Sequence, residues 1–208
     1  MLGRTRASLE RTADTRRDGG GRLIPFEADV SDARGITAVI DRIAAELGGL
    51  DVLVNNAAQT LRGTVEDIDL EQYRAMMAVN VDGVIFTSRA ALPHLRRTRG
   101  CIVNVGSVSG LRGDWGLAAY NASKGALVNL TNAMALDHGH EVRVNAVHPG
   151  ATISNDQMAG IFAPDSPVTT EFTQRIAVGR IGRPDDIADA VAFLAGDASH
   201  QRRAGLTG

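Results

Sequence analysis

The stretch at residues 101–145, CIVNVGSVSG LRGDWGLAAY NASKGALVNL TNAMALDHGH EVRVN, decides the fold of this chain. Its first five residues, Cys101–Val105, are mostly apolar and β-branched, which predicts a buried strand. The chain then passes through Gly106 and Ser107 toward a long run of small, helix-forming residues at 118–138. A polar loop is therefore expected at the carboxyl end of a strand, where open α/β sheets bind their ligands.

Three side chains of this loop and helix, Ser107, Tyr120 and Lys124, form a candidate catalytic group. Tyr120 and Lys124 are four residues apart on the predicted helix, so they share one face. A lysine cation about 4 Å away, at an effective dielectric constant of about 20, would lower a tyrosine pKa from about 10 by up to about 3 units. The spacing predicts Tyr120 as a general acid/base and Ser107 as a hydrogen-bond partner of a substrate oxygen. The alternative is a surface helix with an ordinary i, i+4 contact.

Composition restricts the class of protein. The chain has 208 residues, 44% of them hydrophobic, and we expect one domain over residues 1–208. A net charge of −2 argues against a nucleic-acid partner. No run of eighteen apolar residues occurs, so we expect no membrane partner. The single cysteine, Cys101, is expected to be a buried hydrophobe, and the lack of disulfide pairs fits a cytoplasmic protein.

Hydrophobic periodicity and turn residues place the other elements. Further strands are expected over 23–26, 51–54 and 142–147. Further helices are expected from Ser8 to the glycines at 19–21, from Ser31 or Asp32 to Leu47, over 69–97 with a break near Asp82 and Gly83, and from Arg183 to Gly196. Residues 155–170 hold two prolines and little periodicity, which predicts a mobile loop over a substrate pocket.

Several motifs accompany the candidate catalytic group. They are Asp29-Val30, NNAA at 55–58, VNVDG at 79–83, HPGATIS at 148–154 and the thirteen-residue spacing from Ser107 to Tyr120. Together they resemble the short-chain dehydrogenase/reductase family over about residues 23–195. The resemblance implies an α/β fold with a Rossmann-like doubly wound parallel sheet. It also implies an NAD(P)-dependent oxidoreductase that interconverts a secondary alcohol and a ketone by hydride transfer.

The resemblance assigns roles to individual positions. The catalytic residues would be Asn80, Ser107, Tyr120 and Lys124, with Asn80 holding a water of the proton relay. The cofactor-binding residues would be Asp29, Val30, Asn56, Ala57, Ala58, Tyr120, Lys124, Pro149, Gly150, Thr152 and Ser154. Ala58 departs from the glycine usual in the family, and its methyl group would crowd a close cofactor. Turn chemistry is the alternative for the asparagines at 55 and 56, and a local backbone hydrogen bond is the alternative for Asn80.

The two ends of the chain also depart from the family. Only twenty-two residues precede Leu23, fewer than the roughly 30 of a βαβ unit. We therefore expect an incomplete, N-terminally truncated fold without the first strand, the Gly-rich turn, the first helix and the last strand. Leu2 to Arg4 would be the end of the second strand, and 197–208 a poorly ordered tail. In the family's sheet order 3-2-1-4-5-6-7, the missing strands would lie between the strands expected at 23–26 and 51–54. Either these two strands pair with each other or an apolar edge is exposed.

The cofactor, the substrate and the oligomeric state are less sharply defined by the sequence. Arg4 and Arg6 would suit a 2′-phosphate, but both NAD and NADP remain candidates. The segment at 109–125 and LDHG at 136–139 are similar to acetoin reductases and 2,3-butanediol dehydrogenases of the family, which implies a small alcohol or ketone substrate. We expect a homodimer or homotetramer and no metal site. The competing hypothesis is a catalytically inactive remnant, or an interaction protein that oligomerises through the small residues of 118–138.

Overall fold

The structure is a computed structural model that describes residues 1–14 and 21–199. Its centre is a parallel sheet in the order β3-β4-β5, formed by Val52–Asn55, Cys101–Val105 and Arg143–Val147. Cys101 pairs with Val52 on one side and with Arg143 on the other, so β4 is the central strand. The predicted bounds of β4 are confirmed, β5 begins one residue later than predicted, and β3 is shifted by one residue at both ends.

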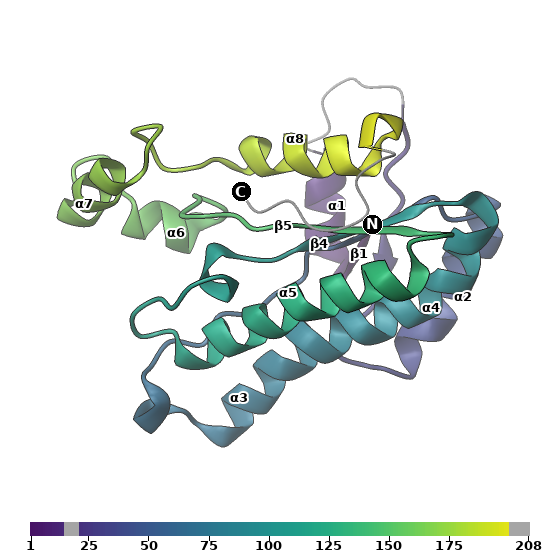
Figure 1. Ribbon diagram of the computed structural model, residues 1–208, viewed down its shortest axis with the longest axis horizontal. Coiled ribbons are helices and arrows are strands. Elements are labelled where there is room, and N and C mark those ends of the chain that lie inside the picture. The colour runs from purple at the N-terminus through teal and green to yellow at the C-terminus, as the bar shows by residue number, and fades with distance from the viewer. Residues whose placement is uncertain (15–20, 200–208) are drawn as a thin grey trace.

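Helices cover both faces of this sheet. Figure 1 shows α4 (Gly83–Thr98) and α5 (Ala118–His138) on one face and α8 (Pro184–Ala195) on the other. The main core is closed by α2 (Gly35–Leu47), whose Ile36 and Ile40 are buried against residues of β3, β4 and α4. The layers confirm an α/β, Rossmann-like parallel arrangement. No helix among the described residues has both the length and the apolar character to cross a bilayer.

A second, two-stranded sheet lies apart from the first. It consists of β1 (Leu2–Gly3) and β2 (Phe26–Glu27), which run parallel, with α1 (Arg6–Asp14) between them in the chain. The predicted strand at 23–26 was therefore misplaced: only its last residue pairs. Pro25 lacks the N–H that a ladder needs, which favours a start after it. The two sheets do not re-pair, so β1 and β3 each keep a free edge within the described chain.

The helical pattern at 69–97 is interrupted as predicted. It divides into α3 (Leu70–Met77), the π-helical segment η2 (Ala78–Asp82) and α4. The N–H of Gly83 bonds the carbonyl of Ala78, five residues back. A Cβ at Gly83 would lie 3.0 Å from a methyl of Val30 and 3.2 Å from its carbonyl oxygen, so glycine lets the two segments approach closely.

The expected mobile loop at 155–170 is instead largely helical. Two short helices, α6 (Asp156–Ile161) and α7 (Pro167–Arg175), occupy most of it. Asn155 and Ser166 cap their first turns by accepting hydrogen bonds from backbone N–H groups at 2.9 and 3.0 Å. Short 3-10 turns lie at Val65–Asp67, Val108–Gly110 and Asp197–Ser199 (η1, η3 and η4). The rest of the predicted tail, and the glycines at 19 and 20, lie outside the described residues.

Candidate active site

The sheet and α5 bring Ser107, Tyr120 and Lys124 together. Ser107 follows β4 directly and caps η3, while Tyr120 and Lys124 lie on the first two turns of α5. Lys124 is only 2% exposed, and its Nζ lies 5.8 Å from the centre of the Tyr120 ring. Gly110 lets the loop after β4 pack closely on the backbone of α5, since a Cβ there would lie 2.5 Å from the Lys124 carbonyl oxygen. The predicted group therefore forms one cluster.

The electrostatics of this group correct the expectation for Tyr120. Burial raises the pKa of Tyr120 above its ordinary value, while a hydrogen bond with Ser107 lowers it in part and the charge of Asp114 raises it. Burial also lowers the pKa of Lys124 to about 8. Lys124 Nζ donates to the Val105 carbonyl at 2.9 Å, and burial is the largest influence on the pKa of the Tyr120 phenol.

Sequence reasoning missed a chain of hydroxyl groups beside Ser107. Ser109 Oγ donates a hydrogen bond to the Asp114 carboxylate. Because a serine hydroxyl has one proton, Ser109 can then only accept from Ser107, whose Oγ lies 3.1 Å away. The carboxylate thereby sets the direction of both hydroxyl groups. No sequence motif connects these three residues, because their contact depends on how the loop folds.

Asn80 joins the loop after β3 to α5. It is 1% exposed, and its Oδ1 accepts from the Gln59 backbone N–H at 2.7 Å. Its Nδ2 donates to the Gln59 carbonyl at 2.8 Å and to Ser123 Oγ at 3.0 Å. The alternative of a local backbone bond is wrong, since both partners are distant in sequence. Its predicted contact with a relay water stays a prediction.

A ladder of buried amides crosses the sheet behind the catalytic group. Asn55 Nδ2 donates to Asn104 Oδ1 at 2.9 Å and to Ser88 Oγ at 3.1 Å. Asn104 Nδ2 donates to Thr131 Oγ1 on α5 at 2.9 Å. Asn55 is thus a strand residue with cross-strand partners and not a turn former. No pattern in the sequence indicates Asn104, Ser88 or Thr131 as its partners.

The loop after β5 lies against the Ser107 loop. The Val108 N–H donates to the Pro149 carbonyl at 3.0 Å. His148 is 5% exposed and fills the space beside Gly106, where a Cβ would lie 2.3 Å from its Nδ1. Burial lowers the pKa of His148, which favours the neutral ring. The predicted cofactor residues of this loop follow: Gly150 is exposed, Thr152 Oγ1 donates to the Gly150 carbonyl at 3.0 Å, and Ser154 is exposed.

The other predicted cofactor residues follow β2 or β3 in the chain. Asp29 accepts from the N–H and hydroxyl of Ser31 at 2.9 and 2.7 Å, and these bonds, with a smaller effect of the Arg4 charge, lower its pKa. Val30, Asn56 and Ala57 line one cavity between the sheets. Ala58 is exposed. No group of three or more metal-ligating side chains occurs within residues 1–14 and 21–199.

These positions fit a dinucleotide chemically. Among the described residues, Lys124 Nζ has one recorded hydrogen bond, to Val105, which leaves two of its three N–H donors for ribose hydroxyls. Gly150 has nothing within 4 Å of a would-be Cβ, so a flat ring has room beside it. The carboxylate of Asp29 supplies a hydrogen-bond acceptor for N–H or hydroxyl groups at the end of a dinucleotide opposite to Gly150.

Comparison with known proteins decides the family. The profile described as enoyl-(acyl carrier protein) reductase matches residues 2–203. The chain is 46% identical over 178 residues to a meso-2,3-butanediol dehydrogenase of Serratia marcescens, covering 85% of this chain and 69% of that protein. This chain belongs to the short-chain dehydrogenase/reductase family. A second member, 2-(S)-hydroxypropyl-CoM dehydrogenase 3 of Xanthobacter autotrophicus, is 45% identical over 192 residues, covering 90% of this chain and 75% of that protein.

Solved structures of similar proteins confirm the fold of this short-chain dehydrogenase/reductase. A gluconate 5-dehydrogenase of Burkholderia cenocepacia, in complex with NADP and tartrate, is 28% identical with a TM-score of 0.89. The match covers 100% of this chain and 82% of that one. An NAD⁺-bound xylitol dehydrogenase is 26% identical with the same TM-score, covering 99% and 85%. The predicted Rossmann-like arrangement is thus confirmed.

Proposed function

We propose that this short-chain dehydrogenase/reductase interconverts a small secondary alcohol and a ketone with NAD or NADP. The observation that carries the proposal is the convergence of Ser107, Tyr120 and Lys124 at the carboxyl end of the central strand. A hydroxyl donor and a phenol beside one oxygen suit carbonyl reduction, since one orients the oxygen and the other exchanges its proton.

Each residue of the group has a definite task in this proposal. Tyr120 gives its proton to the carbonyl oxygen during reduction and takes it back during oxidation. Ser107 turns its hydroxyl from Ser109 to the substrate oxygen, and Lys124 holds ribose hydroxyls with its two remaining donors. A nicotinamide bound beside these residues would supply or accept the hydride. Asp29, Val30, Asn56, Ala57 and Ala58 would hold the adenosine side, and Pro149, Gly150, Thr152 and Ser154 the nicotinamide side.

The substrate we propose is a hydroxyketone or vicinal diol such as acetoin or 2,3-butanediol. The similarity to the Serratia marcescens enzyme, named for that diol, supports it. The Ser109–Asp114 pair also places hydroxyl and carboxylate groups near Ser107, where a second substrate hydroxyl could bond.

A specific observation favours a second candidate, an inactive relative. The raised pKa of Tyr120 opposes its ionisation, and a Xanthobacter autotrophicus protein named inactive 2-(S)-hydroxypropyl-CoM dehydrogenase 2 is 44% identical over 172 residues. NADH and NADPH titrations by fluorescence, followed by acetoin reduction at 340 nm, separate the two. Saturable binding with turnover supports the enzyme. A folded protein that binds neither nucleotide supports the inactive candidate.

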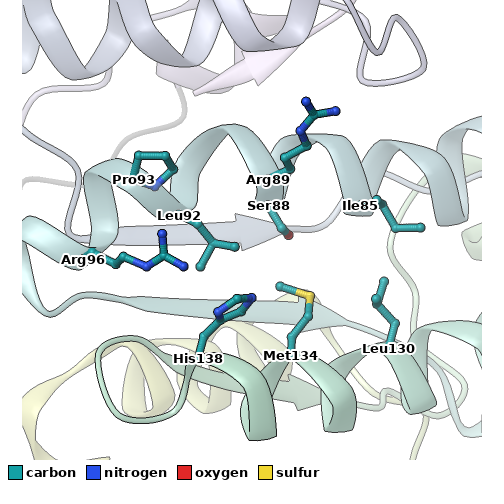
Figure 2. A pocket seen from close by; sticks show the side chains of 9 residues that line it. All are labelled: Ile85, Ser88, Arg89, Leu92, Pro93, Arg96, Leu130, Met134 and His138. Carbon is teal, nitrogen blue, oxygen red and sulfur yellow. The ribbon is translucent and has the colours of Figure 1, made fainter.

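We also propose that two copies of the chain associate through α4 and α5. Figure 2 shows Ile85 and Leu92 on α4 facing Leu130 and Met134 on α5. These residues are among those that line a groove of about 390 Å³, and Tyr120 is not one of them. Ile85 is 37% exposed and Leu136 on α5 is 82% exposed, so this face carries unburied apolar area. Ile85→Lys should convert a dimer or tetramer to monomer in sedimentation velocity. The control Val178→Lys, far from these helices in sequence and also exposed, should not.

A cytoplasmic location is proposed on one ground. The single cysteine, Cys101, is free and buried, which suits a compartment that keeps thiols reduced. Fractionation of cells that express the chain tests this.

A further inference from the structure

A row of three polar side chains leads from Tyr120 to the surface along the loop after β4. Burial is the largest influence on the pKa of the Tyr120 phenol, so this group is shielded from bulk water. Ser107 Oγ donates to Ser109 Oγ at 3.1 Å, and Ser109 Oγ donates to the Asp114 carboxylate. Ser107 and Ser109 are 9% and 6% exposed, whereas Asp114 is exposed. The row therefore connects a buried phenol to a carboxylate in contact with solvent.

The hydrogen bonds of this row all point outward. Ser107 Oγ accepts from the Ser109 N–H at 3.1 Å and gives its single proton to Ser109 Oγ. In its hydrogen bond with the phenol of Tyr120, Ser107 can therefore only accept. Each hydroxyl thus receives a proton on the side of Tyr120 and donates one on the side of Asp114. Such an arrangement lets a proton move along the row by small shifts within each hydrogen bond.

Helix α5 fixes both ends of the row. Tyr120 lies in the first turn of this helix, and Asn121 directly after it donates from Nδ2 to the Asp114 carbonyl at 2.9 Å. The middle of the row is held by η3, in which the Gly110 N–H donates to the Ser107 carbonyl at 3.0 Å. The spacing of the three side chains is therefore set by the backbone.

We propose that Ser107, Ser109 and Asp114 form a proton route between the phenol of Tyr120 and bulk water. The inference rests on the proposed function, in which each reduction leaves Tyr120 as a phenolate that must regain its proton. The phenolate takes the proton of Ser107, and Ser107 takes that of Ser109. Ser109 takes one from the Asp114 carboxylic acid, and solvent protonates the resulting carboxylate. Oxidation runs these steps in reverse, and no electrons move in either direction.

Substrate binding would interrupt this route. When Ser107 turns its hydroxyl to the substrate oxygen, it no longer donates to Ser109. The phenol is then separated from solvent while the substrate proton is transferred, and the route is restored when the product leaves. Asp114 therefore acts on Tyr120 between turnovers.

The exchange rate of the Tyr120 hydroxyl proton tests the route without substrate or nucleotide. The chain has two tyrosines, Tyr73 and Tyr120, and carbon-13 at Cζ reports the exchange of each hydroxyl in mixed light and heavy water. Asp114→Asn keeps an acceptor for Ser109 but cannot carry the proton, so exchange at Tyr120 should slow at least about tenfold, and that at Tyr73 should not change. Asp137→Asn, an equal change of charge at the other end of α5, is the matched control and should alter neither rate. An unchanged rate at Tyr120 in Asp114→Asn would overturn the proposal.

Steady-state kinetics separate proton transfer from substrate positioning. At saturating nucleotide, kcat for acetoin reduction should fall about tenfold in both Asp114→Asn and Asp114→Ala, and KM should stay within about twofold. Formate should restore kcat in Asp114→Ala, where it can occupy the vacated place, and not in Asp114→Asn. An unchanged kcat, with or without a higher KM, would show that no proton route passes through Asp114. Absence of turnover by the wild type contradicts the proposed function instead, and the hydroxyl exchange rates still decide the route.

Discussion

The two sheets of this molecule hold their functional residues in different ways. Behind the catalytic group, β4 pairs over its full length with β5 and over four residues with β3, and buried amides tie the strands to α5. On the other side, β1 and β2 pair over two residues each, and Asp29 is held by Ser31, two positions away. The elements that carry the candidate catalytic group are thus tied together by long-range contacts, whereas the proposed nucleotide end depends on local ones.

The largest effect is expected from Tyr120→Phe, which removes the proton donor and keeps the ring. Acetoin reduction should fall by about 10²–10⁴ in kcat, the usual contribution of a general acid/base. NADH affinity should stay within a few-fold, because Lys124 remains in place. Steady-state kinetics and a fluorescence titration measure the two quantities. Full activity of the variant would contradict the proposed role.

Asn104→Ala tests the contribution of the buried amides to the three-stranded sheet. It leaves the buried Asn55 amide without one acceptor and removes the bond to Thr131, so the free energy of unfolding should fall by about 2–4 kcal/mol. Ser31→Ala, on the other side, removes one exposed bond and should cost less than about 1 kcal/mol. Urea unfolding of both variants measures the contrast. Equal losses would show that the two regions do not differ.

The lowered pKa of Lys124 gives a pH dependence of stability. Between about 8 and 10.5 the unfolded chain holds a proton that the folded chain has released, so the free energy of unfolding rises with pH in this window. From pH 8 to 9.5 the gain should be about 1.5 kcal/mol. Urea unfolding of wild type and Lys124→Met at both pH values isolates this contribution. Parallel changes in the two proteins would disprove it.

The smallest effect is expected at the nucleotide end. Arg4 is near enough to Asp29 to lower its pKa, whereas Arg6 pairs with Glu10 at 2.8 Å. If Arg4 binds a 2′-phosphate, Arg4→Ala should weaken NADPH binding several-fold and leave NADH binding within twofold, as in an exposed ion pair. Arg6→Ala is the matched control and should change neither. Fluorescence titrations with both nucleotides decide the matter.

Sequence patterns predicted what depends on neighbours in the chain. The bounds of β4, the span of α5 and the break near Gly83 all follow from periodicity, glycine and β-branched runs, and they are confirmed. The clustering of Ser107, Tyr120 and Lys124 also followed, since a strand end and a helix turn fix their separation.

What the sequence could not predict depends on distant partners. Asn80 bonds Gln59 and Ser123, 21 and 43 positions away, and no local pattern encodes such pairs. The predicted direction of the Tyr120 pKa shift is wrong because the sequence shows the nearby lysine charge but not the burial of the phenol. The helices at 156–175 were missed because prolines were weighed above the caps Asn155 and Ser166, although Pro167 itself starts a helix.

The π-helical segment Ala78–Asp82 limits which insertions and deletions this chain can tolerate. Successive residues of an α-helix are rotated by about 100° around the helix axis. Removing one residue from this segment would restore α-helical pairing, and it would turn the whole of α4 by that angle relative to α3. Gly83 would then swing away from Val30, and the face that carries Ile85 would rotate with it. In this stretch the number of residues is therefore under tighter constraint than their identity.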